Sequence, residues 1–488
     1  MTNLGGSDGN LRVAFPSDKP VTDYEPTEIH WDYQYILLEN LFSPLVEFGK
    51  HGALHGGIAE HADWVGDELR LTIRNGLKTE NGTPITAADV VFSLKRLLVL
   101  SGNTHGNFKD LVCPGIKLKS VEDNCPDLTS DGNVVIIKTK KREQFLLPML
   151  AAIDFAIIPK SSVDPKTLKI INYKETSGPY YVAKDDGNGH IELKLNPFSY
   201  HASKNIPQTV ELVPELTAKA SLEALLNNQV DLVTTIDAAR ADEVLPFAEK
   251  HSQFRLHETQ NIRVAVLVFT ERGIKELSSE ERRYIGHQVR EAFRTLSNNT
   301  PGYQPTDSFF PGLSDGALTG KQQTDILALN KLHGTKPKGE IKIGLLHDNN
   351  VSLWSNAIRK ALPDAKCSTI SYIPAFGKHS SIDTMPDAFI GATDTSFMED
   401  INLISYSLNA GVFGLTKLER AEWLKKYMSI DDKEKRLKML RNLEFDALSA
   451  PVLVPLVASP YTALVRKPWR FELSTYYAND PIWQITRD

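Results

Sequence analysis

The chain is predicted to be an α/β protein with more than one domain. Short apolar runs that suit strands alternate along the sequence with longer stretches of helical periodicity, which is typical of α/β folds. The length of 488 residues exceeds what one compact core serves, and about two to three domains are expected from length. An apolar content of 41% and a charged content of 24% are ordinary for a globular protein.

Apolar periodicity places the expected elements in order along the chain. Runs rich in β-branched and aliphatic residues predict strands over Leu11–Phe15, Glu68–Ile73, Val134–Thr139, Ile191–Leu195, Thr209–Val213, Val264–Phe269, Ile341–Leu346 and Val452–Val457. Apolar residues at helical spacing predict helices over Trp31–Leu41, Ala87–Leu98, Ala218–Asn227, Ser279–Thr295, Val351–Leu362, Lys417–Tyr427 and Asp432–Ala450. The sequence shows no internal repeat and no low-complexity segment.

The segment 81–98, NGTPITAADVVFSLKRLL, predicts a turn followed by the start of a helix. Gly82 suits a positive φ, and Pro84 fixes the backbone just before the helix. Thr86 can cap the free amides, and Asp89 three residues later completes a capping box near the positive end of the helix dipole.

The helix after this cap is expected to have one apolar face. Its apolar residues recur at helical spacing and are Val90, Leu94, Leu97 and Leu98. The polar residues between them, Ser93, Lys95 and Arg96, are therefore expected to face water.

The same segment resembles a family signature, D-G-T-P-(F/I/V)-T-A-x-D-V-V-F-S-L-x-R. That signature belongs to the family 5 extracellular solute-binding proteins, which are the oligopeptide-, dipeptide- and nickel-binding receptors of ABC importers. Further fragments resemble family motifs in the family's order, at residues 11–18, 39–46, 57–64, 70–78, 177–180, 225–231 and 289–292. Several fragments in the correct order make a chance match very unlikely.

The resemblance implies a class II periplasmic-binding-protein fold with two lobes, a hinge and the inserted subdomain of the peptide-binding cluster. Residues 1–41 would begin lobe I, and 42–174 would be its inserted subdomain. Residues 175–260 would continue lobe I, residues 261–454 would form lobe II, and 455–488 would return to lobe I.

The function implied by the resemblance is that of a receptor and not an enzyme. It would capture an oligopeptide or a related polar organic solute between the lobes and deliver it, as a monomer without cofactor or metal, to ABC permease subunits. The net charge of −6 and the pI near 6.1 argue against a nucleic-acid or anionic-membrane binder. Two alternatives stay open: an oligosaccharide or cell-wall-fragment receptor of the same fold, and a cytoplasmic ligand-sensing regulator that reuses it.

The beginning of the sequence bears on localisation. Residues 1–10 have no apolar signal core, which taken alone suggests a cytoplasmic protein. The resemblance implies instead a periplasmic or membrane-anchored extracytoplasmic protein whose export signal has been removed. Contact with a membrane would then occur only through a lipid anchor that this sequence lacks.

Three candidate ligand-binding residues lie near the N-terminus, and a fourth lies on the return to lobe I. Asp18 follows the opening strand, and Trp31 and Tyr33 stand at the start of a helix that Asp32 is expected to cap. Helix N-termini that flank the first strand of such lobes offer free amides and aromatic faces to a polar organic ligand. Aromatic residues at alternate positions are nevertheless more often half-buried packing. Ser459 is the candidate on the return segment.

The segment 387–403, DAFIGATDTSFMEDINL, resembles the family pattern D-x-x-x-x-x-W-x-A-D-Y-x-D-P-x-x-F-L. In peptide-binding members the central aspartate of that pattern pairs with the peptide's α-amino group. Counting back from the end of the pattern places this position at Ser396, and counting forward from Gly391 places the acid at Asp394. The tryptophan of the family is absent, which weakens the expectation of a free-amine peptide. The candidates here are Asp394, Thr395, Ser396 and Phe397.

Two further patterns are interpreted as surface features. Residues 312–316 match G-x-S-x-G, but Pro311 precedes them and no convincing helix follows, so a surface turn is expected instead of a nucleophile elbow. His51, His55 and His61 could suggest a metal site. The glycines between them argue against convergence on one helix face, so we expect a solvated loop.

The three cysteines are interpreted by their positions. Cys113 and Cys125 flank a stretch rich in proline, glycine and lysine and could close a surface loop. Two unpaired thiols are the alternative, but a bridge is expected in an exported protein and would add about 3 kcal/mol on the entropic model. Cys367 is expected to be a small hydrophobic residue.

Overall fold

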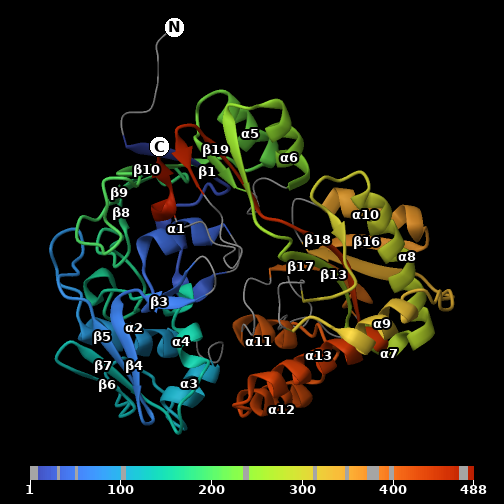
Figure 1. The fold of residues 1–488 in the computed structure, drawn as a ribbon, viewed down its shortest axis with the longest axis horizontal. Helices are drawn as coiled ribbons and strands as arrows, with labels where there is room; N and C mark the ends of the chain where they lie inside the picture. The colour runs from blue at the N-terminus through green and yellow to red at the C-terminus, as the bar shows by residue number, and fades with distance from the viewer. Residues whose placement is uncertain are drawn as a thin grey trace. The chain divides into compact units, whose positions relative to one another are not determined.

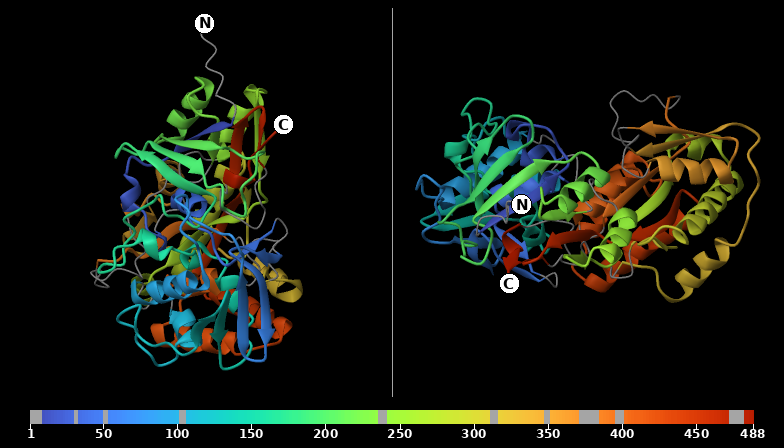
Figure 2. Two further views of the ribbon diagram at one scale, coloured as in Figure 1. Left: turned by 90° about the vertical axis from the view of Figure 1, so that its left-hand side faces the viewer. Right: turned by 90° about the horizontal axis from the view of Figure 1, so that it is seen from above.

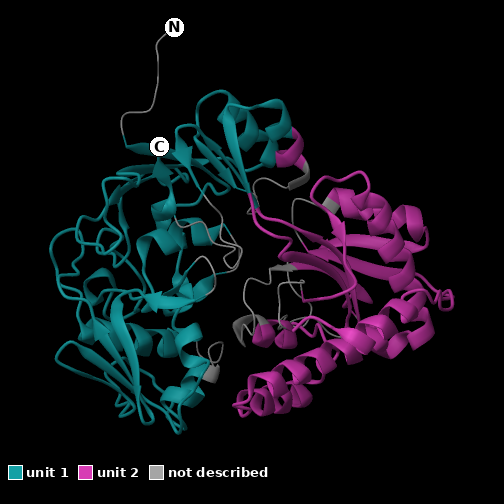
Figure 3. Ribbon diagram, viewed as in Figure 1, with its two compact units in different colours: residues 1–239, 247–257, 462–488 teal, residues 240–246, 258–461 magenta. Residues whose placement is uncertain are grey.

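The chain divides into two compact units, which Figure 3 shows in different colours. Unit 1 holds residues 1–239, 247–257 and 462–488, and unit 2 holds residues 240–246 and 258–461. The structure is a computed structural model that describes residues 9–29, 33–49, 53–100, 106–234, 241–310, 316–346, 351–370, 384–394, 401–471 and 482–488. Within these ranges, no helix is both long and apolar enough to cross a bilayer.

Unit 1 is built on a seven-stranded sheet in the order β12-β19-β11-β1-β10-β9-β8. Figure 1 labels β1, β8, β9, β10 and β19 of this sheet, and Figure 2 shows the ribbon from two further sides. Its strands are β1 Asn10–Phe15, β8 Tyr180–Asp185, β9 Ile191–Leu195, β10 Thr209–Pro214, β11 Leu232–Thr234, β12 Phe254–Glu258 and β19 Thr462–Arg466. β1 pairs in parallel with both β10 and β11, whereas β9 and β19 run antiparallel to their neighbours. A central parallel strand is covered on both faces, which agrees with the nearly continuous burial of β1.

Helix α1 Gln34–Leu41 covers the core of this sheet and begins later than expected. Tyr33 is its N-cap residue and makes no side-chain capping hydrogen bond. The sequence predicted a start at Trp31 with Asp32 as the cap, but both residues lie outside the described ranges.

A second, four-stranded sheet in unit 1 has the order β4-β5-β7-β6. Its strands are β4 Ala59–Val65, β5 Glu68–Ile73, β6 Leu128–Asp131 and β7 Val134–Lys138. Helix α2 Ala87–Leu100 packs against β6 and β7. The smaller elements of unit 1 are β2 Val46–Phe48, β3 Leu54–Gly56, α3 Gly106–Val112, α4 Leu146–Met149, α5 Ala218–Leu226, β20 Trp469–Arg470 and β21 Thr486–Arg487.

The disulfide expected from the sequence is present in this part of unit 1. Cys113 follows α3, Cys125 precedes β6, and both residues are buried. The bridge therefore closes the segment 113–125 and joins the end of α3 to the chain that leads into β6.

The predicted cap of α2 is confirmed in part. The helix begins at Ala87, and the Asp89 carboxylate accepts hydrogen bonds from the backbone amide and the hydroxyl of Thr86, at 3.0 and 2.7 Å. The expectation that Ser93 and Arg96 face water is wrong, because they are only 4% and 1% exposed. Other segments of the chain cover this side of α2, where Ser93 bonds to Ile158 and Arg96 bonds to Leu168. The periodicity of one helix cannot predict such contacts.

Unit 2 contains a six-stranded sheet in the order β14-β18-β13-β17-β15-β16. Its strands are β13 Arg263–Phe269, β14 Gln304–Pro305, β15 Ile341–Leu346, β16 Ala365–Ile370, β17 Ala388–Asp394 and β18 Leu453–Ser459. β15 pairs in parallel with β16 and β17, and β13 runs antiparallel to β17 and β18. Cys367 is half-buried on β16 and packs against the core, as expected for a small hydrophobic residue.

Helices α8 and α10 lie beside this sheet (Figure 1). Their apolar side chains are part of its core. α8 begins with a capping box formed by Ser278 and Glu281, and it buries Ile285, Val289 and Phe293. The helices outside unit 1 are α7 Glu271–Glu276, α8 Ser279–Ser297, α9 Gly320–Leu329, α10 Val351–Ala361, α11 Ile401–Asn409, α12 Lys417–Met428 and α13 Lys433–Ser449. α6 Ala241–Lys250 spans the boundary between the two units.

Candidate functional site

The carboxyl ends of the parallel strands define one edge of the sheet in unit 1. β1, β10 and β11 run in the same direction, so their last residues, Phe15, Pro214 and Thr234, lie at this edge. In open α/β sheets, ligands bind outside the carboxyl ends of the strands. Asp18 follows β1 at this edge and is exposed.

The loop that carries Asp18 is held in place by neighbouring backbone and by a buried tyrosine. The Tyr24 hydroxyl donates a hydrogen bond of 2.5 Å to the hydroxyl of Ser17. Burial raises the pKa of Tyr24, so it remains a protonated donor at neutral pH. A Cβ atom on Gly189 would lie 2.2 Å from the carbonyl oxygen of Ser17, so only glycine allows this close approach. These contacts at Ser17 therefore fix the backbone conformation of the loop that carries Asp18.

Tyr33 lies at the same edge, and its ring packs against the hydrophobic core of unit 1. Its ring meets the ring of Phe15, the last residue of β1, edge-to-face with centroids 5.9 Å apart. It is half-buried against the hydrophobic core of unit 1. Trp31, the neighbouring candidate, lies outside the described residues.

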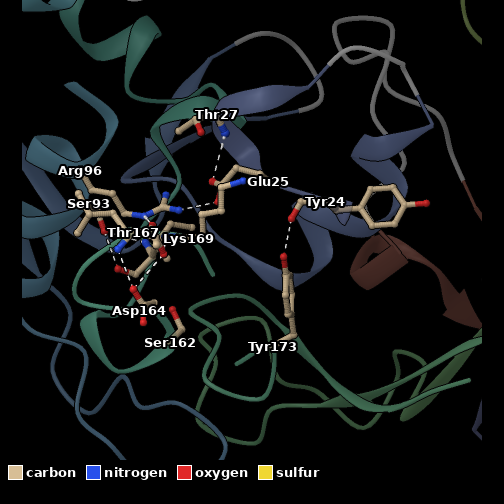
Figure 4. Close-up of polar contacts among 12 residues, drawn as sticks. Tyr24, Glu25, Thr27, Ser93, Arg96, Ser162, Asp164, Thr167, Lys169 and Tyr173 are labelled. Atoms are coloured by element: carbon tan, nitrogen blue, oxygen red, sulfur yellow. Dashed lines mark hydrogen bonds and ion pairs between the residues drawn. The ribbon is translucent and has the colours of Figure 1, made fainter. Parts of the chain in front are cut away.

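A buried ion pair fixes the segment that follows this loop (Figure 4). Arg96 of α2 places Nη2 2.6 Å from Oε2 of Glu25, and its Nε donates to the carbonyl oxygen of Leu168 at 2.7 Å. The hydroxyl of Tyr173 donates to the carbonyl oxygen of Tyr24 at 2.6 Å. These contacts join α2 and the segment 168–173 to the chain just after Asp18.

The corresponding edge of unit 2 brings two predicted residues beside one arginine. The parallel strands β15, β16 and β17 end together here, and Asp394 is the last residue of β17. The register places Asp394 opposite Arg263, the first residue of β13, and places Ser459 opposite Arg263 on the other side. Asp394 comes 131 positions after Arg263 and Ser459 comes 196 positions after it, so strand pairing, and not proximity in sequence, brings these three residues together.

Arg263 is the residue of this edge that sequence reasoning missed. It is half-buried, and its guanidinium carbon lies 6.0 Å from the ring centroid of Tyr461. This is the range of a cation–π contact. Its only signal in the sequence is a cation directly before an apolar strand.

The predicted residues therefore fall into two groups. Asp18 and Tyr33 lie on unit 1, and Asp394 and Ser459 lie on unit 2, so each pair is described within its own unit. The remaining candidates of unit 2, Thr395, Ser396 and Phe397, lie outside the described residues.

The other patterns from the sequence give no catalytic or metal centre in the described part of the chain. His55 and His61 are exposed, but they lie in strands β3 and β4, so the expected loop is wrong. Within the described ranges, no group of three or more His, Cys, Asp or Glu residues is placed to hold a metal ion. His51 and residues 312–315 of the G-x-S-x-G pattern lie outside those ranges.

Comparison with known proteins identifies the relatives of this chain. The family model for the bacterial extracellular solute-binding proteins, family 5 (middle part), matches residues 53–300, just over half of the 488 residues. The periplasmic murein peptide-binding protein MppA of Escherichia coli K12 is 20% identical over 360 residues. This match covers 67% of the chain and 63% of MppA, less than two thirds of that protein.

Solved structures show the same fold. The dipeptide-binding protein of Pseudoalteromonas sp. SM9913 in complex with Met-Leu has a TM-score of 0.78 at 12% identity, covering 98% of this chain and 100% of the other. The E. coli murein tripeptide-binding protein MppA has a TM-score of 0.76 at 14% identity and 99% coverage of both chains. NikA of Staphylococcus aureus in complex with Ni(L-His)2 has a TM-score of 0.71 at 14% identity, covering 98% and 100%. The expected α/β fold with two lobes is confirmed.

Proposed function

Because this chain belongs to family 5 of the bacterial extracellular solute-binding proteins, we propose that it is the extracytoplasmic receptor of an ABC importer. Its ligand would be an oligopeptide or a related polar organic solute. Met-Leu, a murein tripeptide and Ni(L-His)2, the ligands named for three relatives of the same fold, all contain amino acids. A receptor of this kind needs no cofactor and no catalytic group.

The observation that carries the proposal is the trio at the edge of unit 2. The strand register sets Asp394, an acidic residue, and Ser459, a hydroxyl residue, on either side of the basic residue Arg263. The two ends of a peptide are an ammonium and a carboxylate, so such a trio suits a zwitterionic ligand. Asp394, the last residue of β17, would bind the ligand's ammonium group in place of the family's amine-binding aspartate. Ser396 follows two residues later in the sequence.

Closure about the two crossings would couple binding to a change of state. The chain leaves unit 1 after His257 and returns at Thr462. Beside these boundaries, the Thr259 amide donates to the Tyr461 carbonyl oxygen, and the Tyr461 amide donates to the Thr259 hydroxyl, both at 2.9 Å. A ligand that gains contacts from both units only in the closed state shifts the population toward that state.

The partners follow from the family. We expect the closed, loaded receptor to dock as a monomer on ABC permease subunits outside the cytoplasm, with a membrane contact only through a lipid anchor. The release of the solute would reopen the two units and return the receptor to the unloaded state.

Titration calorimetry with end-modified peptides tests this function. A tripeptide with free ends should bind the wild type, and Asp394→Asn should lose about 2–5 kcal/mol of binding free energy because the ligand's ammonium is left without its partner. The N-acetylated peptide should lose a similar amount on the wild type and little more on Asp394→Asn. Ser396→Ala should cost on the order of 1 kcal/mol, the value of one neutral hydrogen bond.

Asp110→Asn is the matched control, because Asp110 is an exposed carboxylate of α3 in the other unit. It should bind the free peptide like the wild type. Equal binding of free and N-acetylated peptides by every variant would refute the amine anchor. Tight binding of a neutral saccharide in their place would favour the oligosaccharide or cell-wall-fragment receptor.

A further inference from the structure

The dipeptide Asn-Gly occurs three times in the sequence, and the structure gives the three copies different surroundings. The pairs are Asn75-Gly76, Asn81-Gly82 and Asn188-Gly189, and all three lie in unit 1. Asparagine is one of the thermolabile residues. It loses its side-chain amide most readily before glycine, which has no side chain to hinder an attack by its own backbone nitrogen. The contacts around each pair therefore decide which of them can react.

The pair Asn81-Gly82 is held by hydrogen bonds on both of the groups that would react. The side-chain oxygen of Asn81 accepts hydrogen bonds from the Thr83 amide at 2.9 Å and from the hydroxyls of Thr79 and Thr83 at 2.9 and 2.7 Å. The Gly82 amide donates to the Thr79 carbonyl oxygen at 3.0 Å. An attack of the Gly82 nitrogen on the Asn81 side chain would first have to break these bonds.

The pair Asn188-Gly189 is held in the turn between β8 and β9. The Asn188 side chain donates to the Asp186 carbonyl oxygen at 3.2 Å, and the Asn188 amide donates to the Asp186 carboxylate at 2.7 Å. Gly189 lies so close to Ser17 that a Cβ atom on it would be 2.2 Å from the Ser17 carbonyl oxygen. The backbone of this pair therefore has little room to change its conformation.

The pair Asn75-Gly76 has none of these restraints. Both residues are exposed in a turn after β5, and a Cβ atom on Gly76 would meet no atom within 4 Å. Among the residues that the structure describes, neither the Asn75 side chain nor the Gly76 amide has a hydrogen-bond partner. The chain is fixed on both sides of the turn, because Arg74 donates to the Gly57 carbonyl oxygen at 2.7 Å and Leu77 is buried. The turn itself can rearrange without breaking a hydrogen bond.

We propose that Asn75 is a site of non-enzymatic deamidation, with water as the co-reactant. The Gly76 nitrogen gives its proton to hydroxide and attacks the side-chain carbonyl carbon of Asn75. The bond from this carbon to the side-chain nitrogen breaks, and that nitrogen takes up a proton and leaves as ammonia. One water molecule then opens the cyclic succinimide. Opening at the side-chain carbonyl gives aspartate, and opening at the main-chain carbonyl gives isoaspartate, whose backbone is longer by one methylene.

Peptide mapping by mass spectrometry tests the proposal on the whole folded chain, incubated at pH 8. Each Asn-Gly pair is followed by the mass change that accompanies loss of ammonia and gain of water. Each hydrogen bond that must open slows the reaction severalfold, so Asn75 should react at least about tenfold faster than Asn81. Asn75 should also react faster than Asn188. In the chain unfolded by guanidinium chloride, the three rates should become similar, because the contacts that distinguish the pairs are lost.

Isoelectric focusing of two variants gives a second measurement. Deamidation of one asparagine adds one negative charge, so the formal net charge changes from −6 to −7. Asn75→Gln should delay this acidic form, because the longer side chain would have to close a larger ring. Asn188→Gln is the matched control in another exposed turn of unit 1, and it should form the acidic species as fast as the wild type. If Asn75 reacts no faster than Asn81 in the folded chain, or if the ratio of their rates is the same after unfolding, the proposal is overturned.

Discussion

The buried ion pair between Arg96 and Glu25 leads to the sharpest prediction about stability. The arginine side chain is 1% exposed and the glutamate side chain 14% exposed, and the pair sits 2.6 Å apart. Arg96→Met keeps the volume of the side chain roughly but removes the cation. It leaves the Glu25 carboxylate without its partner and removes the hydrogen bond to the Leu168 carbonyl.

The size of the loss follows from these contacts. Breaking a buried ion pair by removing one partner costs about 3–5 kcal/mol, because the remaining charge stays buried. The 14% exposure of the Glu25 side chain allows some contact with water, so we expect a loss of about 3 kcal/mol in the free energy of unfolding. Arg70→Met provides the control: Arg70 pairs with Glu68 at 2.8 Å on the surface, at 47% and 28% exposure. That pair should contribute less than about 1 kcal/mol.

Urea unfolding of both variants measures the difference. Unit 1 is followed by hydrogen exchange of the α2 amides, so that unfolding of unit 2 does not obscure the result. The α2 amides should lose protection in Arg96→Met and keep it in Arg70→Met. Equal losses below about 1 kcal/mol in the two variants would refute the view that this pair holds α2 to the loop after β1.

Three further results are expected. Thiol titration of denatured, unreduced protein should find one free thiol per chain, since Cys113 and Cys125 are bridged; three would contradict the bridge. Burial raises the pKa of Glu444 to about 7 from its usual 4.5, so the folded chain holds this proton more tightly and loses stability as the pH rises from about 4.5 to 7. Glu444→Gln should remove that loss, on the order of 3 kcal/mol, and a parallel pH profile for both would count against it. A bound solute at about 100 times its dissociation constant should add about 2.7 kcal/mol of stability and reduce the radius of gyration in small-angle scattering, whereas binding without compaction would exclude closure.

Local rules predicted the elements of this fold well where a segment's own residues decide its structure. The start of α2 at Ala87 follows from Thr86 and Asp89, which interact within one turn. Strand β1 follows from an apolar run that is buried on both faces. The start of α2 and the strand β1 both depend on residues that are close in sequence, so the sequence alone is enough to predict them.

The predictions that are wrong concern residues whose burial or secondary structure depends on a segment distant in sequence. Ser93 looks like a surface residue of α2, yet its hydroxyl donates to the carbonyl oxygen of Ile158 at 2.8 Å and is buried. Arg96 looks equally exposed, but its partner Glu25 comes 71 positions earlier in the chain. The exposed His55 and His61 were assigned to a loop because glycines surround them, whereas strand pairing sets their structure.

The candidate site shows the same division. Asp394 and Ser459 could be proposed from motif and position, but nothing local indicates that both lie opposite Arg263. The strand order β18-β13-β17 creates that arrangement. β17 and β18 each begin more than one hundred residues after β13 begins. Sequence reasoning therefore proposed Asp394 and Ser459 separately and missed Arg263, which the register places between them.

Native mass spectrometry of the purified chain tests the central claim most directly. After the protein is stripped of bound solute and incubated with a mixed peptide pool, we predict one added mass per chain that fragments into amino-acid residues. Asp394→Asn should lose this mass under the same conditions, while Asp110→Asn should retain it. A wild-type chain that takes up no peptide from the pool, or that retains only a saccharide, would contradict the peptide-receptor account.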